Sequence, residues 1–192
     1  LNIPYAQYIK GDLDFAKNIV IDNRNSIAFH IGGGIAIPYG NARMIPFEKR
    51  YFSGGANSVR GWSVRSLGPG TFSDEKGNFM NQSGDIKLDA SIEYRTRLFW
   101  KFRGALFVDA GNIWTIREYQ DQPGGKFKFD QFYKQIAVAY GVGLRLDLDF
   151  FVLRFDGGMK AINPEKGKDR YPILRSDFGR DFAFHFAVGY PF

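Results

Sequence analysis

The sequence predicts an all-β protein whose antiparallel strands form a transmembrane β-barrel. Three observations support this prediction. Apolar and polar side chains alternate along runs of often about ten residues, the length of a tilted membrane crossing and longer than the usual soluble strand. Short turns and long loops alternate between these runs, as they do in outer-membrane barrels. The last run carries an apolar and aromatic face that ends on Phe192.

The composition excludes several other classes of protein. The 192 residues fit one domain, and the absence of cysteine excludes disulfides, thiolate catalysis and the usual structural zinc sites. The net charge is +6, but Lys and Arg are spread along the chain, so no nucleic-acid partner is expected. A transmembrane helix is excluded because no run of about 18 apolar residues occurs. The chain opens on Leu1 without a signal peptide, so we expect a mature chain or a fragment.

The first two runs differ in strength. A weak strand is predicted from about Tyr5 to Ala16, with Lys10, Asp12 and Asp14 on its polar face. Small residues occupy one face of the second run and of the fifth and last runs described below. They either let another backbone approach closely or permit sharp bending, and both explanations remain open. The second run alternates as Ile27, Phe29, Ile31, Ile35 and Ile37 against Ala28, His30, Gly32, Gly34 and Ala36.

The clearest strand follows Asp85, and a tight reversal near Phe99 and Trp100 leads into its partner. Its apolar face is Ile86, Leu88, Ala90, Ile92, Tyr94, Thr96 and Leu98, and its polar face is Lys87, Asp89, Ser91, Glu93, Arg95 and Arg97. The partner places Phe102, Leu106, Val108 and Ala110 on one face and Lys101, Arg103, Phe107 and Asp109 on the other. Both runs have the period of two that predicts a strand.

Three further strands complete a predicted set of seven, and a tight turn at Asp149 and Phe150 separates the first two of them. The fifth run opposes Ile136, Val138, Tyr140, Val142, Leu144, Leu146 and Leu148 to Gln135, Ala137, Ala139, Gly141, Gly143, Arg145 and Asp147. The sixth opposes Phe151, Leu153 and Phe155 to Val152, Arg154 and Asp156. The last, from Asp181, opposes Phe182, Phe184, Phe186, Val188, Tyr190 and Phe192 to Asp181, Ala183, His185, Ala187, Gly189 and Pro191.

Periodicity alone does not say which face is inside. In a lipocalin-like or sandwich protein the same apolar faces would form the core, whereas strand length and loop asymmetry favour the membrane. An odd number of strands is also unusual, because closed bacterial barrels use an even number from eight upward. Either one strand is missed, or the chain is the C-terminal part of a larger barrel.

The loop at about residues 38–84 is expected to be functional, since a loop of this length in a compact domain is rarely a plain connection. It is not composed like a disordered tether, because Tyr51, Phe52, Val59 and Trp62 require a surface to bury against. Arg60 lies between Val59 and the Gly61-Trp62 pair, which suggests a docked loop tip with Arg60 directed at a carboxylate.

The stretches Lys49–Gly55, Ser58–Trp62 and Ser66–Pro69 resemble the signature of the BamA/TamA superfamily of outer-membrane assembly and translocation barrels, also called the bacterial surface antigen family. The hallmark of that family is a Val/Ile-Arg-Gly-aromatic tetrad at the tip of an extracellular loop that folds back into the lumen. Here the tetrad is Val59, Arg60, Gly61 and Trp62, with Trp62 in place of the more usual Phe or Tyr.

The resemblance extends to other residues of this chain. Glu93 and Asp109 are similar to acidic residues of the family on two adjacent strands, and both lie on the polar faces read above. The C-terminal residues resemble the targeting signal of outer-membrane barrels: Phe184, Phe186, Val188, Tyr190 and Phe192. Family members have sixteen strands and periplasmic POTRA domains. The resemblance therefore implies that residues 1–192 are the last seven strands of such a barrel in the bacterial outer membrane.

Two functions follow as expectations. The resemblance implies a factor that inserts or exports other outer-membrane proteins through a lateral seam, with client β-barrel or secreted proteins, membrane lipid and accessory envelope proteins as partners. The alternative is a passive barrel: a pore, an adhesin or the anchor of a passenger, and POTRA repeats before residue 1 would favour the first. No catalytic residue, metal or cofactor is expected, and His30 and His185 are read as polar lining.

Overall fold

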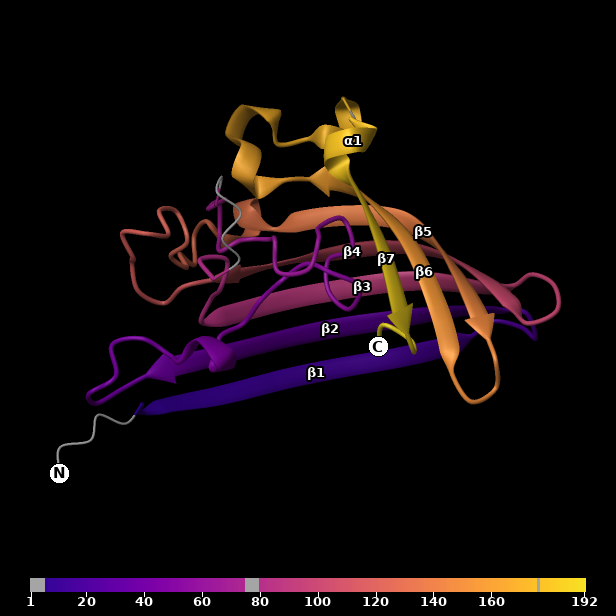
Figure 1. Cartoon of the computed structure of the whole chain (residues 1–192), viewed down its shortest axis with the longest axis horizontal. Coiled ribbons are helices and arrows are strands. Elements are labelled where there is room, and N and C mark those ends of the chain that lie inside the picture. Colours follow the sequence, from indigo (N-terminus) through magenta and orange to yellow (C-terminus); the bar gives the residue numbers. More distant parts are fainter. Residues whose placement is uncertain (1–5, 75–79, 176) are drawn as a thin grey trace.

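The computed structural model describes residues 6–74, 80–175 and 177–192, and in these residues seven strands form one antiparallel sheet (Figure 1). The strands pair in chain order, each with its sequence neighbours. Their bounds are β1 Tyr8–Val20, β2 Asn25–Pro38, β3 Ile86–Arg97, β4 Phe102–Trp114, β5 Ala137–Asp147, β6 Val152–Ile162 and β7 Phe182–Val188. The all-β, antiparallel expectation is confirmed, and no described helix is long and apolar enough to cross a membrane.

Short hairpins join β1 to β2, β3 to β4 and β5 to β6 at one end of the sheet. Trp100 and Asp149 take positive φ angles of 48° and 70° in two of these turns, as tight hairpin turns require. At the first turn the Asp22 carboxylate accepts hydrogen bonds from the backbone N–H groups of Arg24 and Asn25. The predicted asymmetry of the loops is therefore present.

The long connections leave the opposite end of the sheet (Figure 1). They contain short helical turns. The long loops predicted from the sequence span about residues 38–84, 115–134 and 162–180, and of these residues 75–79 and 176 lie outside the described part. The turns are η1 Phe47–Lys49, η2 Phe132–Gln135, η3 Pro164–Asp169, η4 Pro172–Leu174 and α1 Phe178–Asp181.

The two faces of the sheet have opposite character. The apolar face predicted to meet the membrane is at the surface, where Phe184 and Phe186 are 62% and 59% exposed and Ile92 and Leu144 are also exposed. On the same face, two further predicted residues, Tyr94 and Val138, are half-buried. The concave face instead buries charged side chains, which is the reverse of a soluble β protein. The lipocalin-like alternative is therefore wrong for this sheet.

Two strand limits differ from the prediction. Tyr5 lies outside the described residues, and β1 runs on beyond Ala16 to Val20. Its partner β2 continues the pairing along this whole length, so the pairing extends the strand past the point where its own weak alternation fades.

The last strand was predicted to reach Phe192, and this is wrong because β7 ends at Val188. Gly189 has a φ of 90°, a conformation that turns the chain and that glycine adopts without strain. The rings of Tyr190 and Phe192 then lie 4.7 Å and 5.4 Å from the guanidinium of Arg95 on the polar face. These two residues therefore leave the apolar face that Phe184, Phe186 and Val188 continue to share.

We expect the isolated 192-residue chain to self-associate in buffer without detergent. In the described part of the chain β1 and β7 each pair on one side only, and free strand edges recruit other chains. Sedimentation velocity with and without detergent measures this, and detergent should reduce association by covering the apolar face. A stable monomer in plain buffer would contradict the expectation.

Candidate functional site

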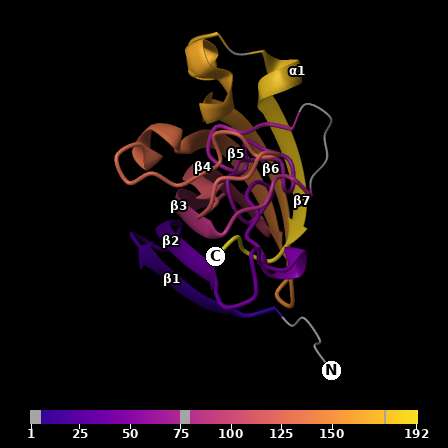
Figure 2. The same cartoon turned by 90° about the vertical axis from the view of Figure 1, so that its left-hand side faces the viewer.

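The described residues of the connection between β2 and β3 lie inside the arc of the sheet (Figure 2). Its base is fixed where Tyr51 and Gly84 exchange backbone hydrogen bonds of 2.8 Å and 2.9 Å. The Tyr51 hydroxyl also donates to Asp12 Oδ1 on β1 at 2.6 Å. These contacts attach the loop to the sheet at its entrance, before the chain reaches the tetrad.

The tetrad forms a turn in which the Trp62 N–H donates to the Val59 carbonyl at 3.2 Å. Val59 and Trp62 are buried and join a small apolar cluster with Leu67 of the loop and Ala137 and Ala139 of β5. The aromatic and aliphatic side chains thus anchor the turn on both sides of Arg60. Their burial also explains why a loop this long holds one position.

Arg60 is 1% exposed and contacts two carboxylates of the sheet. Its Nε and Nη2 donate to Asp109 Oδ2 and Oδ1 at 2.7 Å and 2.8 Å, a bidentate pair. Its Nη1 donates to Glu93 Oε2 at 2.6 Å, and its backbone N–H donates to Asp109 Oδ2 at 3.0 Å. The guanidinium carbon lies 3.5 Å from the ring centre of Phe107. The contact predicted from the sequence is present with both acids.

Burial by itself would lower the pKa of Arg60. The hydrogen bonds to Asp109, and the negative charges of Asp109 and Glu93, outweigh burial and raise that pKa above its usual value. Arg60 therefore keeps its charge at any physiological pH. The loop tip is a permanent cation in a buried acidic socket.

Three residues that the sequence reading did not single out extend this site. Arg145 of β5 donates to Glu93 Oε2 at 2.9 Å and to Asp156 Oδ1 at 2.6 Å. Asp156 Oδ2 in turn lies 3.7 Å from Arg60 Nη1 and 3.1 Å from Arg154 Nε. Their polar-face positions were visible in the alternation, but nothing in the sequence placed them at the height of Arg60 along the strands.

The loop backbone also touches the last two strands. His185 Nε2 of β7 lies 3.0 Å from the Arg60 carbonyl oxygen, and Arg154 Nη2 donates to the Ala56 carbonyl at 2.9 Å. His185 is therefore a loop contact rather than plain lining. Together with the apolar contacts of β5, contacts from β3, β4, β6 and β7 converge on a single loop tip.

Small residues make this approach possible. A Cβ on Gly158 would stand 2.7 Å from the Arg60 carbonyl carbon, and one on Gly61 would stand 2.8 Å from Ala139 Cβ. Both separations are shorter than real Cβ contacts allow. Of the two explanations for the small residues, close approach therefore holds at Ala139, and Gly158 of β6, which the prediction did not include, allows a second close approach.

The structure does not bring the C-terminal residues into this site. Phe184, Phe186 and Val188 point to the opposite, exposed face. Tyr190 and Phe192 lie on the polar face but contact Arg95 and His30, with the Phe192 and His30 rings stacked at 5.1 Å. Arg95 connects the two regions, because its Nε donates to Glu93 Oε1 at 2.8 Å.

Known proteins resemble this chain in sequence and in architecture. The outer membrane protein assembly factor BamA of Neisseria meningitidis serogroup B is 30% identical over 183 residues, covering 84% of this chain and 21% of the relative. The human sorting and assembly machinery component 50 homolog is 28% identical over 160 residues, covering 77% and 33%. The chain thus spans only about a fifth to a third of the length of these relatives.

Solved structures support the fold. BamA from Haemophilus ducreyi lacking POTRA domains 1–3 aligns with a TM-score of 0.67 at 22% identity, over 95% of this chain and 35% of that one. CdiB from Acinetobacter baumannii aligns with a TM-score of 0.55 at 17% identity, over 96% and 27%. A sequence profile of the Omp85 superfamily domain matches residues 5–192. The chain belongs to the Omp85 superfamily.

Proposed function

We propose that residues 1–192 form the C-terminal part of a sixteen-stranded barrel in the bacterial outer membrane that inserts or exports other outer-membrane proteins. The observation that carries the proposal is the buried pairing of Arg60 with Asp109 and Glu93. A pore needs an open interior, whereas this loop tip lies against the polar face and contacts β3, β4, β5, β6 and β7. Membership in a superfamily that includes the assembly factor BamA supports the same function.

In the proposed mechanism β7 is one lip of a lateral seam. It has seven residues, the shortest of the described strands, and its outer edge has no partner within the described residues. An edge of this kind pairs with an incoming strand through backbone hydrogen bonds. The apolar side chains of Phe184, Phe186 and Val188 keep this lip in contact with lipid while the client strand is added.

In the proposed mechanism the docked loop tip is rigid, in contrast to the seam at β7. Arg60 and its backbone contact Glu93 of β3, Asp109 of β4 and His185 of β7. The tetrad is thus proposed to hold the wall of the barrel while the seam opens. Client β-barrel or secreted proteins and accessory envelope proteins are the proposed partners.

Depletion of the full-length protein in its own cells tests the function. We expect other β-barrel proteins to lose their folded, heat-modifiable forms on gels, and the wild-type gene to restore them. A complementing gene with Arg65→Gln should restore these forms as well as the wild-type gene does. Arg65 is exposed in the same loop and lies over Phe52 rather than a carboxylate, so this substitution controls for any change of charge in the loop. Normal folding of other barrels during depletion would favour a pore, an adhesin or a passenger anchor.

A further inference from the structure

An apolar hollow of about 430 Å³ lies on the exposed face of the sheet, the face that meets the membrane. It extends from the middle of β5 and β6 toward α1, in the half of the sheet nearer the long connections. None of the described residues that line it is charged. Its lining includes Leu106 of β4, Tyr140 and Val142 of β5, Gly157 and Met159 of β6, and Phe182 of β7.

The hollow exists because one side chain is missing from an otherwise filled row across four strands. Leu106 of β4 lies opposite Val142 of β5. Gly157 of β6 continues the row between Val142 and Phe184 of β7. The three larger residues are exposed on the apolar face, whereas Gly157 adds no side chain to it. The space above Gly157 therefore opens toward the membrane.

The short helix α1 borders the hollow on the side of the long connections, where it leads into β7 (Figure 1). Phe178 of α1 is 68% exposed, and its ring stacks on Phe182 at 4.3 Å. The buried carboxylate of Asp181 accepts hydrogen bonds of 3.1 Å from the Asp177 N–H and from Arg180 Nη2, which fix the turn that carries Phe178. The aromatic wall of the hollow is therefore held in place by the fold itself.

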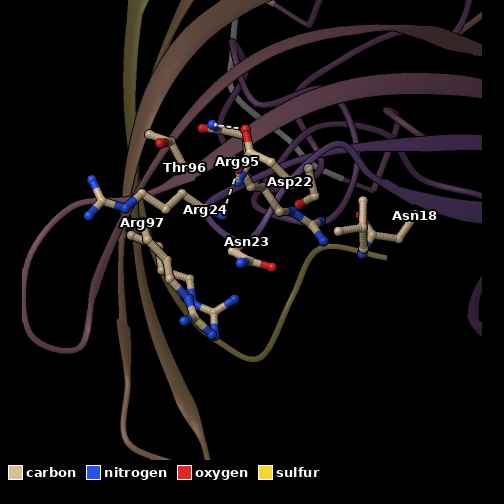
Figure 3. A pocket seen from close by; sticks show the side chains of 11 residues that line it. Asn18, Asp22, Asn23, Arg24, Arg95, Thr96 and Arg97 are labelled. Atoms are coloured by element: carbon tan, nitrogen blue, oxygen red, sulfur yellow. Dashed lines mark hydrogen bonds between the residues drawn. The ribbon is translucent and has the colours of Figure 1, made fainter.

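A hydrocarbon chain suits this hollow better than a peptide does. Within the hydrocarbon layer every backbone N–H and C=O group needs a partner, and an acyl chain has no such group to satisfy. Leaving the space unfilled would also forfeit dispersion contacts with its lining. The hollow of about 170 Å³ at the short-turn end is different in kind, because polar side chains such as Asn18, Asn23 and Thr96 line it (Figure 3).

We propose that the hollow at Gly157 holds one acyl chain of a membrane lipid from the leaflet at the end of the long connections. The hollow is continuous with the apolar face of the sheet, so a lipid reaches it by lateral movement within that leaflet. The site recognises the hydrocarbon chain and not the headgroup, since its lining offers no charge. The proposal rests on the membrane placement of this face and not on which proteins the barrel assembles.

The test is native mass spectrometry of the full-length protein released from detergent micelles that contain graded dioleoylphosphatidylethanolamine. Gly157→Leu fills the hollow, because a side chain added there meets the ring of Phe182, with the Cβ 3.1 Å from Cε2. Gly104→Leu is the matched control: Gly104 lies on the same apolar face, outside the described lining, and its Cβ would have ordinary contacts of 3.5 Å or more. Dioleoylglycerol lacks the headgroup, and dibutyrylphosphatidylethanolamine keeps the headgroup but lacks long chains, so these two probes separate chain from headgroup.

The wild type and Gly104→Leu should retain one long-chain lipid that Gly157→Leu loses. Gly157→Leu should bind dioleoylphosphatidylethanolamine at least about tenfold more weakly, because overfilling a packed space costs that factor or more. Dioleoylglycerol should be retained as well as the phospholipid, and dibutyrylphosphatidylethanolamine should not be retained. Unchanged binding by Gly157→Leu, or equal retention of the short-chain lipid, would overturn the proposal. A co-purifying polypeptide that Gly157→Leu loses in place of lipid would overturn it too.

A second variant decides the question if Gly157→Leu does not reach its heat-modifiable folded form. Phe178→Ala removes the aromatic wall from an exposed position of a short helix, so the sheet should fold normally. It should weaken retention of the long-chain lipid in the same direction, whereas Phe150→Ala, at an exposed hairpin tip of the opposite end, should not. Equal retention by these two variants would overturn the proposal. Barrel assembly in cells is a separate readout, so failure here leaves the proposed function standing.

Discussion

Replacing Arg60 by alanine should release the loop tip from the polar face of the sheet. Asp109 is fully buried and would lose its bidentate side-chain partner, keeping the 2.8 Å hydrogen bond from Ser91 Oγ and, while the tip stays docked, the one from the backbone N–H of residue 60. Leaving one member of a buried ion pair without its partner typically costs about 3–5 kcal/mol. Water reaches Asp109 once the loop opens. The substitution should therefore lower the free energy of loop docking more than the free energy of unfolding of the sheet.

Chymotrypsin cleavage after Trp62 measures that opening, since Trp62 is buried in the docked loop. In the full-length protein in detergent, Arg60→Ala should raise the cleavage rate by about a hundredfold or more, because each 1.4 kcal/mol is a factor of ten when cleavage follows the open population. Arg65→Gln in the same loop should leave the rate unchanged. Equal cleavage of wild type and Arg60→Ala would show that the ion pair does not hold the loop.

The two acids should differ in importance. Glu93 keeps Arg145 and Arg95 as partners after Arg60 is removed, whereas Asp109 has no other cation within ion-pair distance among the described residues. Asp109→Asn should therefore open the loop more than Glu93→Gln. Arg60→Lys should be intermediate, because a lysine keeps the charge but lacks the planar fork.

The alternation along the strands predicted on which face of the sheet each side chain of this site lies. Glu93 and Asp109 fell on the polar face by their period of two, but the family resemblance, not the alternation, singled them out from the other carboxylates of that face as partners of Arg60. Arg145 and Asp156 shared that face, but their height relative to Arg60 depends on strand register. Register comes from pairings such as Gly143 opposite Asp156, which no single strand contains.

The end of the last strand shows a second limit of alternation. Tyr190 and Phe192 keep the correct parity, so the pattern extends the strand to the last residue. The backbone at Gly189 instead takes a positive φ, and the next aromatic rings cross to the face that bears Arg95. A glycine in a strand pattern permits such a turn without requiring it, so the sequence leaves both outcomes possible.

Gly158→Ala should undock the same loop without changing a single charge. The added Cβ would stand 2.7 Å from the Arg60 carbonyl carbon and 3.1 Å from the Gly61 nitrogen, and closer still to the Arg60 carbonyl oxygen. These are backbone atoms, so no rotamer change relieves the overlap. Gly33→Ala is the matched control, because its nearest neighbours, Lys87 O and Leu88 Cδ1, would be 3.8 Å and 3.9 Å away.

Chymotrypsin cleavage after Trp62 again gives the measurement, and Gly158→Ala should raise its rate at least about tenfold, since overpacking typically costs 1–3 kcal/mol. Gly33→Ala should match the wild type. Combining Gly158→Ala with Arg60→Ala should add less than the sum of the two effects, because a loop already undocked makes neither contact. If Gly158→Ala stays resistant while Arg60→Ala is cleaved, the charge pair alone positions the tip, and close backbone approach at β6 is not required for docking.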